Sequence, residues 1–282
     1  MNFKTVNKKS PGLPINDLNC IKSIFNTKKW PTYGYFDDDI FNNFCNMLAD
    51  LEADERELVL SLTEKFLWVQ EFDYIPYFAR AFDKFITDYE FIHGNKILLC
   101  PLLPEEDFGK TKSSVCLLYL IKSYFNVMRS KYSSFYIDYA DSPASVDLIK
   151  VKNDGYILCL IDDFIGTGET VERAVKYFLD KQIGKDMMVI VSLVGMKFGL
   201  SMLENKEYKV YVDISCEKGL VGYDENKIQL MRNIETKIKV LPEFNFGYKS
   251  SEALIKMMHT PNNTFPIYWL RNKNNKFAPF PR

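Results

Sequence analysis

The sequence predicts an α/β protein in which a parallel β-sheet follows an N-terminal α-helical domain. In residues 21–93, apolar side chains recur at spacings of three and four, as on one face of a helix. After Gly94, short apolar runs alternate with helical periods, which is typical of strands joined by crossover helices. We therefore expect an extended arm at residues 1–20, a helical domain at 21–93 and an α/β domain at 94–282.

The composition excludes several classes of protein. Of the 282 residues, 47% are hydrophobic and 26% are charged, which is an ordinary balance for a folded globular protein. The net charge of −1 gives no support for a polybasic surface that binds nucleic acid or membranes. The sequence has no run of about 18 apolar residues, and its first ten residues are mostly polar and contain three lysines. We therefore expect neither a membrane span nor a signal peptide, and a cytoplasmic location.

Histidine and cysteine usage argues against a metal centre built from clusters of these side chains. The sequence has only two histidines, His93 and His259, and none of its six cysteines forms a C-x-x-C pair. Cys100, Cys116 and Cys159 lie in apolar runs. This placement favours reduced, buried thiols in a reducing compartment.

Three helices account for the periodicity of the N-terminal third. The first covers residues 39–51, and the second covers 55–72, where Asp54 and Glu57 resemble a capping box. Pro76 interrupts the pattern, and a third helix then continues to about Tyr89. No helix of this region is strongly basic, so we expect it to pack or to dock a partner rather than to bind nucleic acid directly.

The α/β part is expected to contain strands, helices and one hairpin. Apolar runs flanked by turn residues mark the strands, and three-to-four spacing marks the helices. Asp154-Gly155 separates the two arms of the hairpin. The strands lie at 96–103, 134–138, 187–194 and 209–215, the helices at 114–128 and 169–181, and the hairpin arms at 146–151 and 156–161. The C-terminal extension from Pro242 is rich in aromatic residues, Pro and Asn and receives no assignment.

One segment, residues 157–170, combines the features of a phosphate-binding site. Five apolar residues lead to Asp162-Asp163, and Gly166-Thr167-Gly168 then precedes a helix. Glycines let backbone N–H groups converge on an anion, and the N-terminus of a helix attracts phosphate. Carboxylates beside such a turn suit a ligand that carries hydroxyls or Mg2+ near its phosphate, as ribose 5-phosphate does. The alternative is a helix-entry turn with solvated acids.

This segment resembles the ribose-phosphate motif of the type I phosphoribosyltransferase family. The motif is an apolar strand, two acids, two apolar residues and a Thr/Gly-rich turn that opens a helix. The resemblance implies a type I phosphoribosyltransferase-like core that binds phosphoribosyl pyrophosphate (PRPP) with Mg2+. It also implies that Asp162 and Asp163 contact the ribose hydroxyls and Mg2+, and that Phe164 lies on the base side. By the same resemblance, the residues that line the 5-phosphate are Gly166, Thr167, Gly168, Glu169 and Thr170.

Two residues depart from the family pattern. Purine-salvage members have an acid at the position of Gly166 that assists at the base, so that role has no occupant here. Glu169 places a negative charge near the phosphate, and its carboxylate is expected to point to solvent from the first helical turn. The missing acid favours, as an alternative to an enzyme, a non-catalytic module that senses a nucleotide and acts through a partner.

A second loop, residues 104–111, ends like a Walker A motif. Pro104 replaces the first glycine, and the acids at 105–107 occupy the cradle, so the loop is a poor site for a triphosphate. In type I phosphoribosyltransferases, the turn after the first strand binds pyrophosphate. By that resemblance, the pyrophosphate-binding candidates are Lys110, Lys112, Ser113 and Ser114, and the alternative is a solvated loop.

The C-terminal region extends the resemblance. Segments 246–255 and 260–269, with the helical N-terminal third, resemble a phosphoribosyltransferase-like group of bacterial conflict systems that includes some retron antiviral operons. This resemblance implies an effector of antiviral defence with other defence subunits as partners. It is compatible with a phosphoribosyltransferase, a related nucleotide hydrolase or a non-catalytic module. Asn262 and Asn263 are suited either to read a nucleobase edge or to cap the turn after Pro261.

Overall fold

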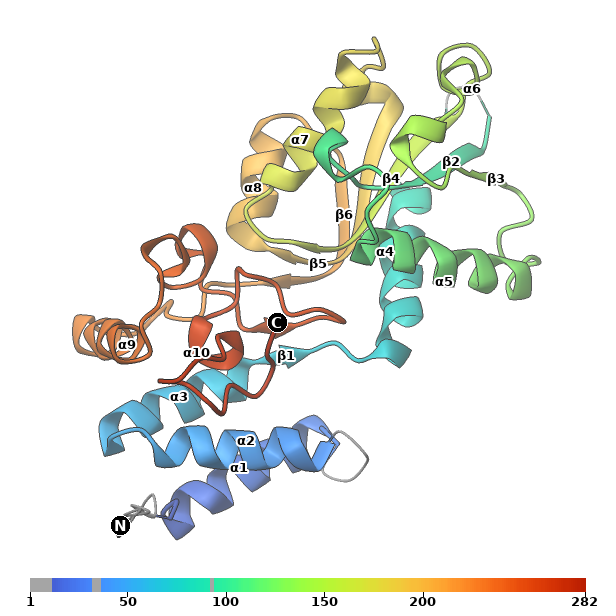
Figure 1. Ribbon diagram of the computed structural model, residues 1–282. Helices are drawn as coiled ribbons and strands as arrows, with labels where there is room; N and C mark the ends of the chain where they lie inside the picture. The colour runs from blue at the N-terminus through green and yellow to red at the C-terminus, as the bar shows by residue number, and fades with distance from the viewer. Residues whose placement is uncertain (1–11, 32–36, 92–93) are drawn as a thin grey trace, which may run out of the picture. The chain divides into compact units, whose positions relative to one another are not determined.

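The computed structural model describes residues 12–31, 37–91 and 94–282, and the chain divides into two compact units (Figure 1). The first unit contains the chain up to Trp68 together with Gly219–Lys256 and Thr260–Arg282. The second unit contains Val69–Lys218 and Met257–His259. This division differs from the expected boundary between residues 93 and 94. It also groups most of the C-terminal region with the N-terminal helices rather than with the α/β domain.

The first unit is a helical body with a small parallel sheet. Buried aromatic rings form its core, in which Phe66 stacks on Phe280 with ring centroids 5.3 Å apart and packs against Tyr268 at 4.7 Å. The C-terminal region therefore supplies part of this core. The elements are α1 (Ile15–Lys28), α2 (Asp37–Ala49), α3 (Ala53–Lys65), α9 (Glu225–Lys237) and α10 (Pro266–Trp269), with β1 (Leu67–Trp68) paired to β7 (Ile255–Lys256).

The extended arm expected at residues 1–20 is wrong from residue 15 onward, where helix α1 begins. Pro14 precedes the helix, and its carbonyl accepts a hydrogen bond from the N–H of Leu18 at 2.9 Å. Proline is compatible with this boundary because no helical partner is needed there for a backbone N–H. The helix packs against α3 of the same unit. Residues 1–11 lie outside the part of the chain that the structure describes.

The second unit confirms the predicted α/β class. Within the described residues its sheet has five strands in the order β3-β2-β4-β5-β6, and all neighbouring pairs are parallel. Helices α4 and α5 pack on one face, and α7 and α8 cover the other (Figure 1). The strands are β2 (Lys96–Pro101), β3 (Tyr136–Tyr139), β4 (Ile157–Ile165), β5 (Met188–Met196) and β6 (Val210–Cys216). The helices are α4 (Tyr74–Asp88), α5 (Ser113–Val127), α6 (Leu148–Lys152), α7 (Glu169–Leu179) and α8 (Lys197–Asn205).

The strand order creates a topological switch point at the carboxyl ends of β2 and β4. The chain passes from β2 to its neighbour β3 on one side and then crosses to β4 on the other side of β2. The segments that follow β2 and β4 therefore diverge. In open parallel sheets, ligands bind in the crevice at such a point. The turn that follows β4 here is Gly166-Thr167-Gly168.

The predicted hairpin is wrong, because its first arm contains a helix. Residues 148–152 form α6, and the carboxylate of Asp147 accepts hydrogen bonds from the N–H groups of Ile149 at 3.0 Å and Lys150 at 3.4 Å. This N-cap stabilises a helical turn within an apolar stretch that also suits a strand. The second arm belongs to β4, which pairs in parallel with β2 and β5.

Two helices of the N-terminal third differ from expectation at their ends. The second expected helix, 55–72, ends at Lys65, because strand β1 follows almost at once. Pro76 does not interrupt a helix but lies in the first turn of α4, where proline removes no required hydrogen bond. Helix α4 packs on β5 and β6, which explains why it belongs to the second unit. Across the described residues, no helix is both long and apolar enough to span a bilayer.

Candidate functional site

Two adjacent acids lie near the carboxyl end of the central strand β4. Asp162 is in register with Ser192 of β5, and the pairing continues to Ile165 opposite Gly195. The acids are therefore part of the strand rather than of the turn after it, and successive side chains of a strand point to opposite faces. Asp163 is only 5% exposed, whereas Asp162 is partly exposed. Of the two, Asp162 is the more accessible acid.

Two hydroxyl groups hold the buried carboxylate of Asp163. Ser113, the first residue of α5, donates from Oγ to Oδ1 at 2.8 Å. Tyr74, the first residue of α4, donates from its hydroxyl to Oδ2 at 3.2 Å. The backbone N–H of Asp163 in turn donates to Oδ1 of Asp162 at 3.0 Å. The two acids therefore belong to one hydrogen-bonded network that two helices fix in place.

Burial raises the pKa of both carboxyl groups. For Asp162, the charge of the neighbouring Asp163 raises the pKa further. For Asp163, hydrogen bonds from Ser113 and Tyr74 stabilise the ionised form and oppose part of the effect of burial. A pair of acids in this state gains free energy when a hydroxyl donor or a cation is placed beside it. The acids therefore suit a ligand with hydroxyl groups or a bound cation.

The turn after β4 leads directly into the N-terminus of α7. Gly168 has a φ of +85° and is the N-cap of α7. This left-handed conformation is accessible to glycine at little cost. The N–H of Glu169 donates to Oγ1 of Thr167 at 3.5 Å. The first N–H groups of a helix have no carbonyl partner inside it, and the helix dipole attracts negative charge there.

Helix α8 packs directly on this turn. A β-carbon at Gly199 would overlap the carbonyl oxygen of Gly166. A β-carbon at Gly168 would lie 2.7 Å from Cε of Met202. The absence of side chains at these glycines lets α8 approach the backbone closely. Packing from α8 therefore helps to fix the shape of the turn.

The other predicted ribose-phosphate residues surround the turn. Glu169 and Thr170 are the first two residues of α7, and Thr170 is exposed. Phe164 is partly exposed and is two residues after Asp162, so both lie on the same face of β4. The structure thus brings Asp162, Phe164 and the glycine turn together at one end of the strand.

The predicted pyrophosphate lysines form ion pairs within their own loop. Nζ of Lys110 lies 2.9 Å from Oδ1 of Asp107, and Nζ of Lys112 lies 3.1 Å from Oδ2. The hydrogen bond from Lys110, assisted by Lys112, lowers the pKa of Asp107. Both lysines are well exposed, and exposed ion pairs contribute little to stability. A bound anion could therefore compete with Asp107 for these lysines.

The predicted pyrophosphate serines have partners inside the protein. Ser114 is 1% exposed, and its Oγ donates to the carbonyl of Leu102 at 3.3 Å. Ser113 donates to Asp163, as described above. Residues 105–107 form a short 3-10 turn after Pro104 rather than an open phosphate cradle. The loop therefore lacks the geometry of a Walker A motif, and Ser113 and Ser114, at the start of α5, bond to Asp163 and to Leu102.

A family model decides what kind of protein this is: the PRTase-CE model matches residues 36–282. The chain belongs to the PRTase-CE family. This phosphoribosyltransferase-like family is associated with conflict systems. The match agrees with the resemblance carried by residues 157–170 and by the C-terminal segments. A search of curated proteins gives no match.

The paired asparagines of this PRTase-CE protein stabilise a turn of the first unit. Asn263 is 8% exposed and donates from Nδ2 to Oγ of Ser251 at 3.1 Å. The carbonyl of Asn262 accepts a hydrogen bond from the N–H of Tyr248 at 2.8 Å. These contacts favour the turn interpretation of the pair over direct recognition of a nucleobase.

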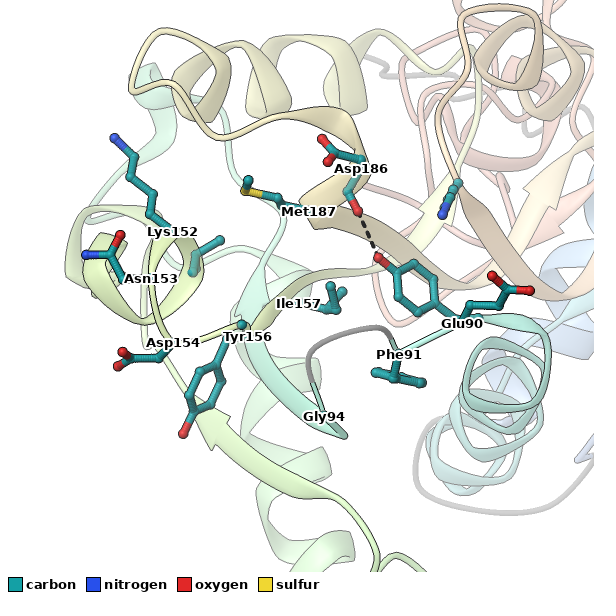
Figure 2. A pocket seen from close by; sticks show the side chains of 14 residues that line it. Glu90, Phe91, Gly94, Lys152, Asn153, Asp154, Tyr156, Ile157, Asp186 and Met187 are labelled. Carbon is teal, nitrogen blue, oxygen red and sulfur yellow. Dashed lines mark hydrogen bonds between the residues drawn. The ribbon is translucent and has the colours of Figure 1, made fainter.

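A separate cavity of about 510 Å3 opens at the amino ends of the strands (Figure 2). Tyr89, which follows α4, donates from its hydroxyl to the backbone carbonyl of Asp186 at 2.8 Å along one wall. Figure 2 shows the side chains of Lys152 and Asp154 pointing away from Ile157. Ile157, at the start of β4, lines the cavity, whereas Asp162 lies near the other end of the same strand. The cavity is therefore not part of the acid site.

Sequence analysis did not identify Tyr74 as part of the site. Tyr74 precedes Asp163 by 89 positions and lies in a region that was expected to form a separate helical domain. Its only local signal is its place at the start of a helix. Recognition of its role requires the fold, because α4 packs on the sheet that contains Asp163.

Proposed function

We propose that this PRTase-CE protein binds PRPP, or a nucleotide with the same ribose 5-phosphate unit, together with Mg2+. The observation that supports this best is the position of Asp162 just before a glycine turn that opens α7. A carboxylate and the first N–H groups of a helix thus follow one another along the chain at the switch point of the sheet. Ribose 5-phosphate carries the two kinds of group that these elements bind.

In this proposal the ligand lies across the end of β4. The 5-phosphate accepts hydrogen bonds from backbone N–H groups in residues 166–170, and the ribose hydroxyls donate to Asp162. Asp163 stays buried and holds Asp162 in place through its backbone N–H. Phe164 lies on the same strand face as Asp162 and provides an apolar contact on the base side.

The side chains present fit a Mg2+ ion that arrives with its ligand. Mg2+ prefers oxygen ligands, keeps several waters, and is commonly held by one or two carboxylates together with substrate phosphates. Asp162 offers such a carboxylate, and Asp163 supports it. In the described part of the chain, no three or more His, Cys, Asp or Glu side chains gather into a metal site. When bound, Mg2+ would neutralise charge on the pyrophosphate.

As an enzyme, the protein would transfer the phosphoribosyl group. The bond between C1 of the ribose and the pyrophosphate oxygen breaks, and its electron pair leaves with pyrophosphate. A nitrogen or oxygen atom of the acceptor then bonds to C1 and gives up its proton to the solvent or to the released pyrophosphate, and water as the acceptor would give hydrolysis. Positive charge develops at C1 and the ring oxygen, so positioning and nearby negative charge would supply most of the catalysis.

A second candidate function is non-catalytic nucleotide sensing within a defence complex. One observation favours it: the hydroxyls of Ser113 and Ser114 have partners in the protein, so the pyrophosphate side keeps mainly the exposed Lys110 and Lys112. The sequence also has Gly166 where salvage enzymes have an acid. Such a module would bind the ribose phosphate and act on a partner protein.

Membership of a conflict-system family supports a role in bacterial antiviral defence, such as that of a retron-associated effector. In that role, the ribose-phosphate site would either carry out the toxic reaction or report the nucleotide state of the infected cell. Both versions require Asp162 and the glycine turn.

Isothermal titration calorimetry tests the binding proposal. PRPP, ribose 5-phosphate and pyrophosphate are each titrated into the full chain in the presence of Mg2+. We expect micromolar affinity for PRPP, weaker binding of ribose 5-phosphate and the weakest binding of pyrophosphate. A folded protein that gives no heat with PRPP or with ribose 5-phosphate would contradict the proposal.

Release of pyrophosphate distinguishes the two candidate functions. The protein is incubated with PRPP, Mg2+ and a panel of bases, nucleosides and nucleotides. If wild type releases pyrophosphate and Asp162→Asn does not, the result would support transfer or hydrolysis. Tight binding of PRPP without release, across the panel and with water alone, would support the sensing module.

A further inference from the structure

Tyr74 is a buried side chain whose hydroxyl has two polar partners. The residue is 1% exposed and begins helix α4. Its hydroxyl oxygen accepts a hydrogen bond from the N–H of Met258 at 2.6 Å. The same hydroxyl donates to Oδ2 of Asp163 at 3.2 Å. The hydroxyl therefore joins a backbone group of the C-terminal region to the acid pair.

The hydroxyl of Tyr74 is a permanent donor. Burial raises the pKa of the phenol, and the charge of Asp163 raises it further, so the proton stays on the oxygen. A buried hydroxyl costs free energy unless it is hydrogen-bonded, whereas phenylalanine would fill the same space without that cost. The hydroxyl is thus explained by its two partners rather than by packing.

We infer that Tyr74 is a positioning residue for the proposed ribose-binding acids, an inference that rests on the proposed function. Tyr74 and Ser113 hold the two oxygens of Asp163 from two helices. Asp163 acts on Asp162 in two ways: its backbone N–H donates to Oδ1 of Asp162, and its charge raises the pKa of the Asp162 carboxyl group. Tyr74 thus acts on the ligand through Asp163 and does not touch it.

The same hydrogen bonds connect the acid pair to a short piece of the C-terminal region. Met257–His259 belongs to the second unit, while the residues on both sides of it belong to the first. The N–H of Met258 orients the hydroxyl that holds Asp163. We expect a ligand that stabilises the acids to stabilise the bond at Met258 as well, because coupling between two sites is reciprocal. The segment is therefore an indirect part of the site.

A double-mutant cycle measured by calorimetry tests whether Tyr74 acts through Asp163. PRPP with Mg2+ is titrated into wild type, Tyr74→Phe, Asp163→Asn and the double variant. Tyr74→Phe should weaken binding by about 3- to 10-fold, because a hydrogen bond to a charged group is lost. The double variant should bind no more weakly than Asp163→Asn alone.

The matched control is Tyr89→Phe, which removes a partly buried hydrogen bond from the tyrosine hydroxyl to the carbonyl of Asp186, just beyond the other end of α4. This variant should bind PRPP as wild type does. Wild-type affinity in Tyr74→Phe would overturn the inference. The inference would also be overturned if the losses of binding free energy in Tyr74→Phe and Asp163→Asn add up fully in the double variant, because Tyr74 would then act independently of Asp163.

Hydrogen exchange at the amide of Met258 provides a readout without ligand. The amide should be protected in wild type and in Tyr89→Phe, and it should exchange faster in Tyr74→Phe and in Asp163→Asn. If wild type binds no PRPP, the proposed function fails, and this readout alone decides whether Tyr74 links Met258 to Asp163. Equal exchange in all variants would overturn the link. If Tyr74→Phe does not fold, the comparison of Asp163→Asn with wild type decides.

Discussion

Gly199 lies so close to Gly166 that a β-carbon at position 199 would overlap the Gly166 carbonyl oxygen. Gly199 is in the first turn of α8, and Gly166 opens the turn after β4. The contact connects the proposed phosphate turn to a helix that is not part of the ribose-phosphate motif. The shape of the turn therefore depends on packing from outside the motif.

Gly199→Ala should impair the phosphate turn. Alanine in place of glycine normally stabilises a helix by about 0.5–1 kcal/mol, but here the added methyl must displace the backbone of the turn. We expect calorimetry to show a loss of ribose 5-phosphate affinity of about tenfold or more. Ser201→Ala, at an exposed position of the same helix, is the control and should bind normally. Unchanged affinity in Gly199→Ala would show that the turn does not need this packing.

The double change Lys110→Ala/Lys112→Ala should weaken binding of the pyrophosphate end of PRPP and leave binding of its ribose 5-phosphate end unchanged. Both lysines are exposed and pair only with Asp107 among the ion pairs described, so they can exchange that partner for pyrophosphate at low cost. We expect PRPP affinity to fall by about 5- to 10-fold, with ribose 5-phosphate affinity unchanged. Calorimetry with both ligands measures the difference. Equal PRPP affinity in variant and wild type would identify the lysines as ordinary loop residues.

Stability should fall as the pH rises toward neutrality, because of Glu235. Its carboxylate is 2% exposed and accepts the N–H of Phe246 on both oxygens, at 2.9 and 3.0 Å. Burial, with a smaller contribution from the charge of Glu252, raises the pKa of Glu235 to about 7 from an ordinary 4.5. The folded state thus favours the protonated form. The contribution of the Glu235 carboxyl group to the free energy of unfolding is fully present below pH 4.5, and it is lost as the pH rises through about 7.

Glu235→Gln should remove this pH dependence. The amide oxygen still accepts the Phe246 N–H, and no buried charge forms. We expect the variant to be more stable than wild type at pH 8, by up to about 3 kcal/mol, and similar to wild type at pH 4. Thermal unfolding at the two pH values measures the effect, with the exposed Glu243→Gln as control. An equal pH response in wild type and Glu235→Gln would contradict the assignment.

Protection against bacteriophage should depend on the acid site. Wild type and Asp162→Asn are expressed with their neighbouring genes in a bacterial host, and plaque formation is counted. We expect protection with wild type and its loss with Asp162→Asn, at equal protein levels. Asp141→Asn, a change at an exposed acid on the same unit, is the control. Protection that survives Asp162→Asn would separate any defence role from ribose-phosphate binding.

The core of the α/β unit was predictable from the sequence because its signals are local. Strand β4, the acids and the glycine turn are contiguous in residues 157–170. Because they follow one another along the chain, they are also close together in the structure. The other strands are short apolar runs between turn residues, and each was placed within a few residues. The predicted hairpin failed because the N-cap at Asp147 outweighed the strand-like composition of residues 148–152.

The division into units and the support of Asp163 depend on contacts between distant parts of the chain. Phe280 packs on Phe66, and Tyr74 contacts both Met258 and Asp163. No periodicity or motif marks these pairs, because each side chain alone looks like an ordinary core residue. The sequence therefore locates the acids and the turn but not the residues that hold them in place.

A crystal soaked with PRPP and Mg2+ tests the central claim most directly. We expect the 5-phosphate within about 3 Å of the backbone nitrogens of residues 166–170, with the ribose hydroxyls at Asp162. Asp163 should keep its hydrogen bonds to Ser113 and Tyr74. Ligand density elsewhere in the protein, or an empty turn in crystals of a protein that binds PRPP in solution, would contradict this account.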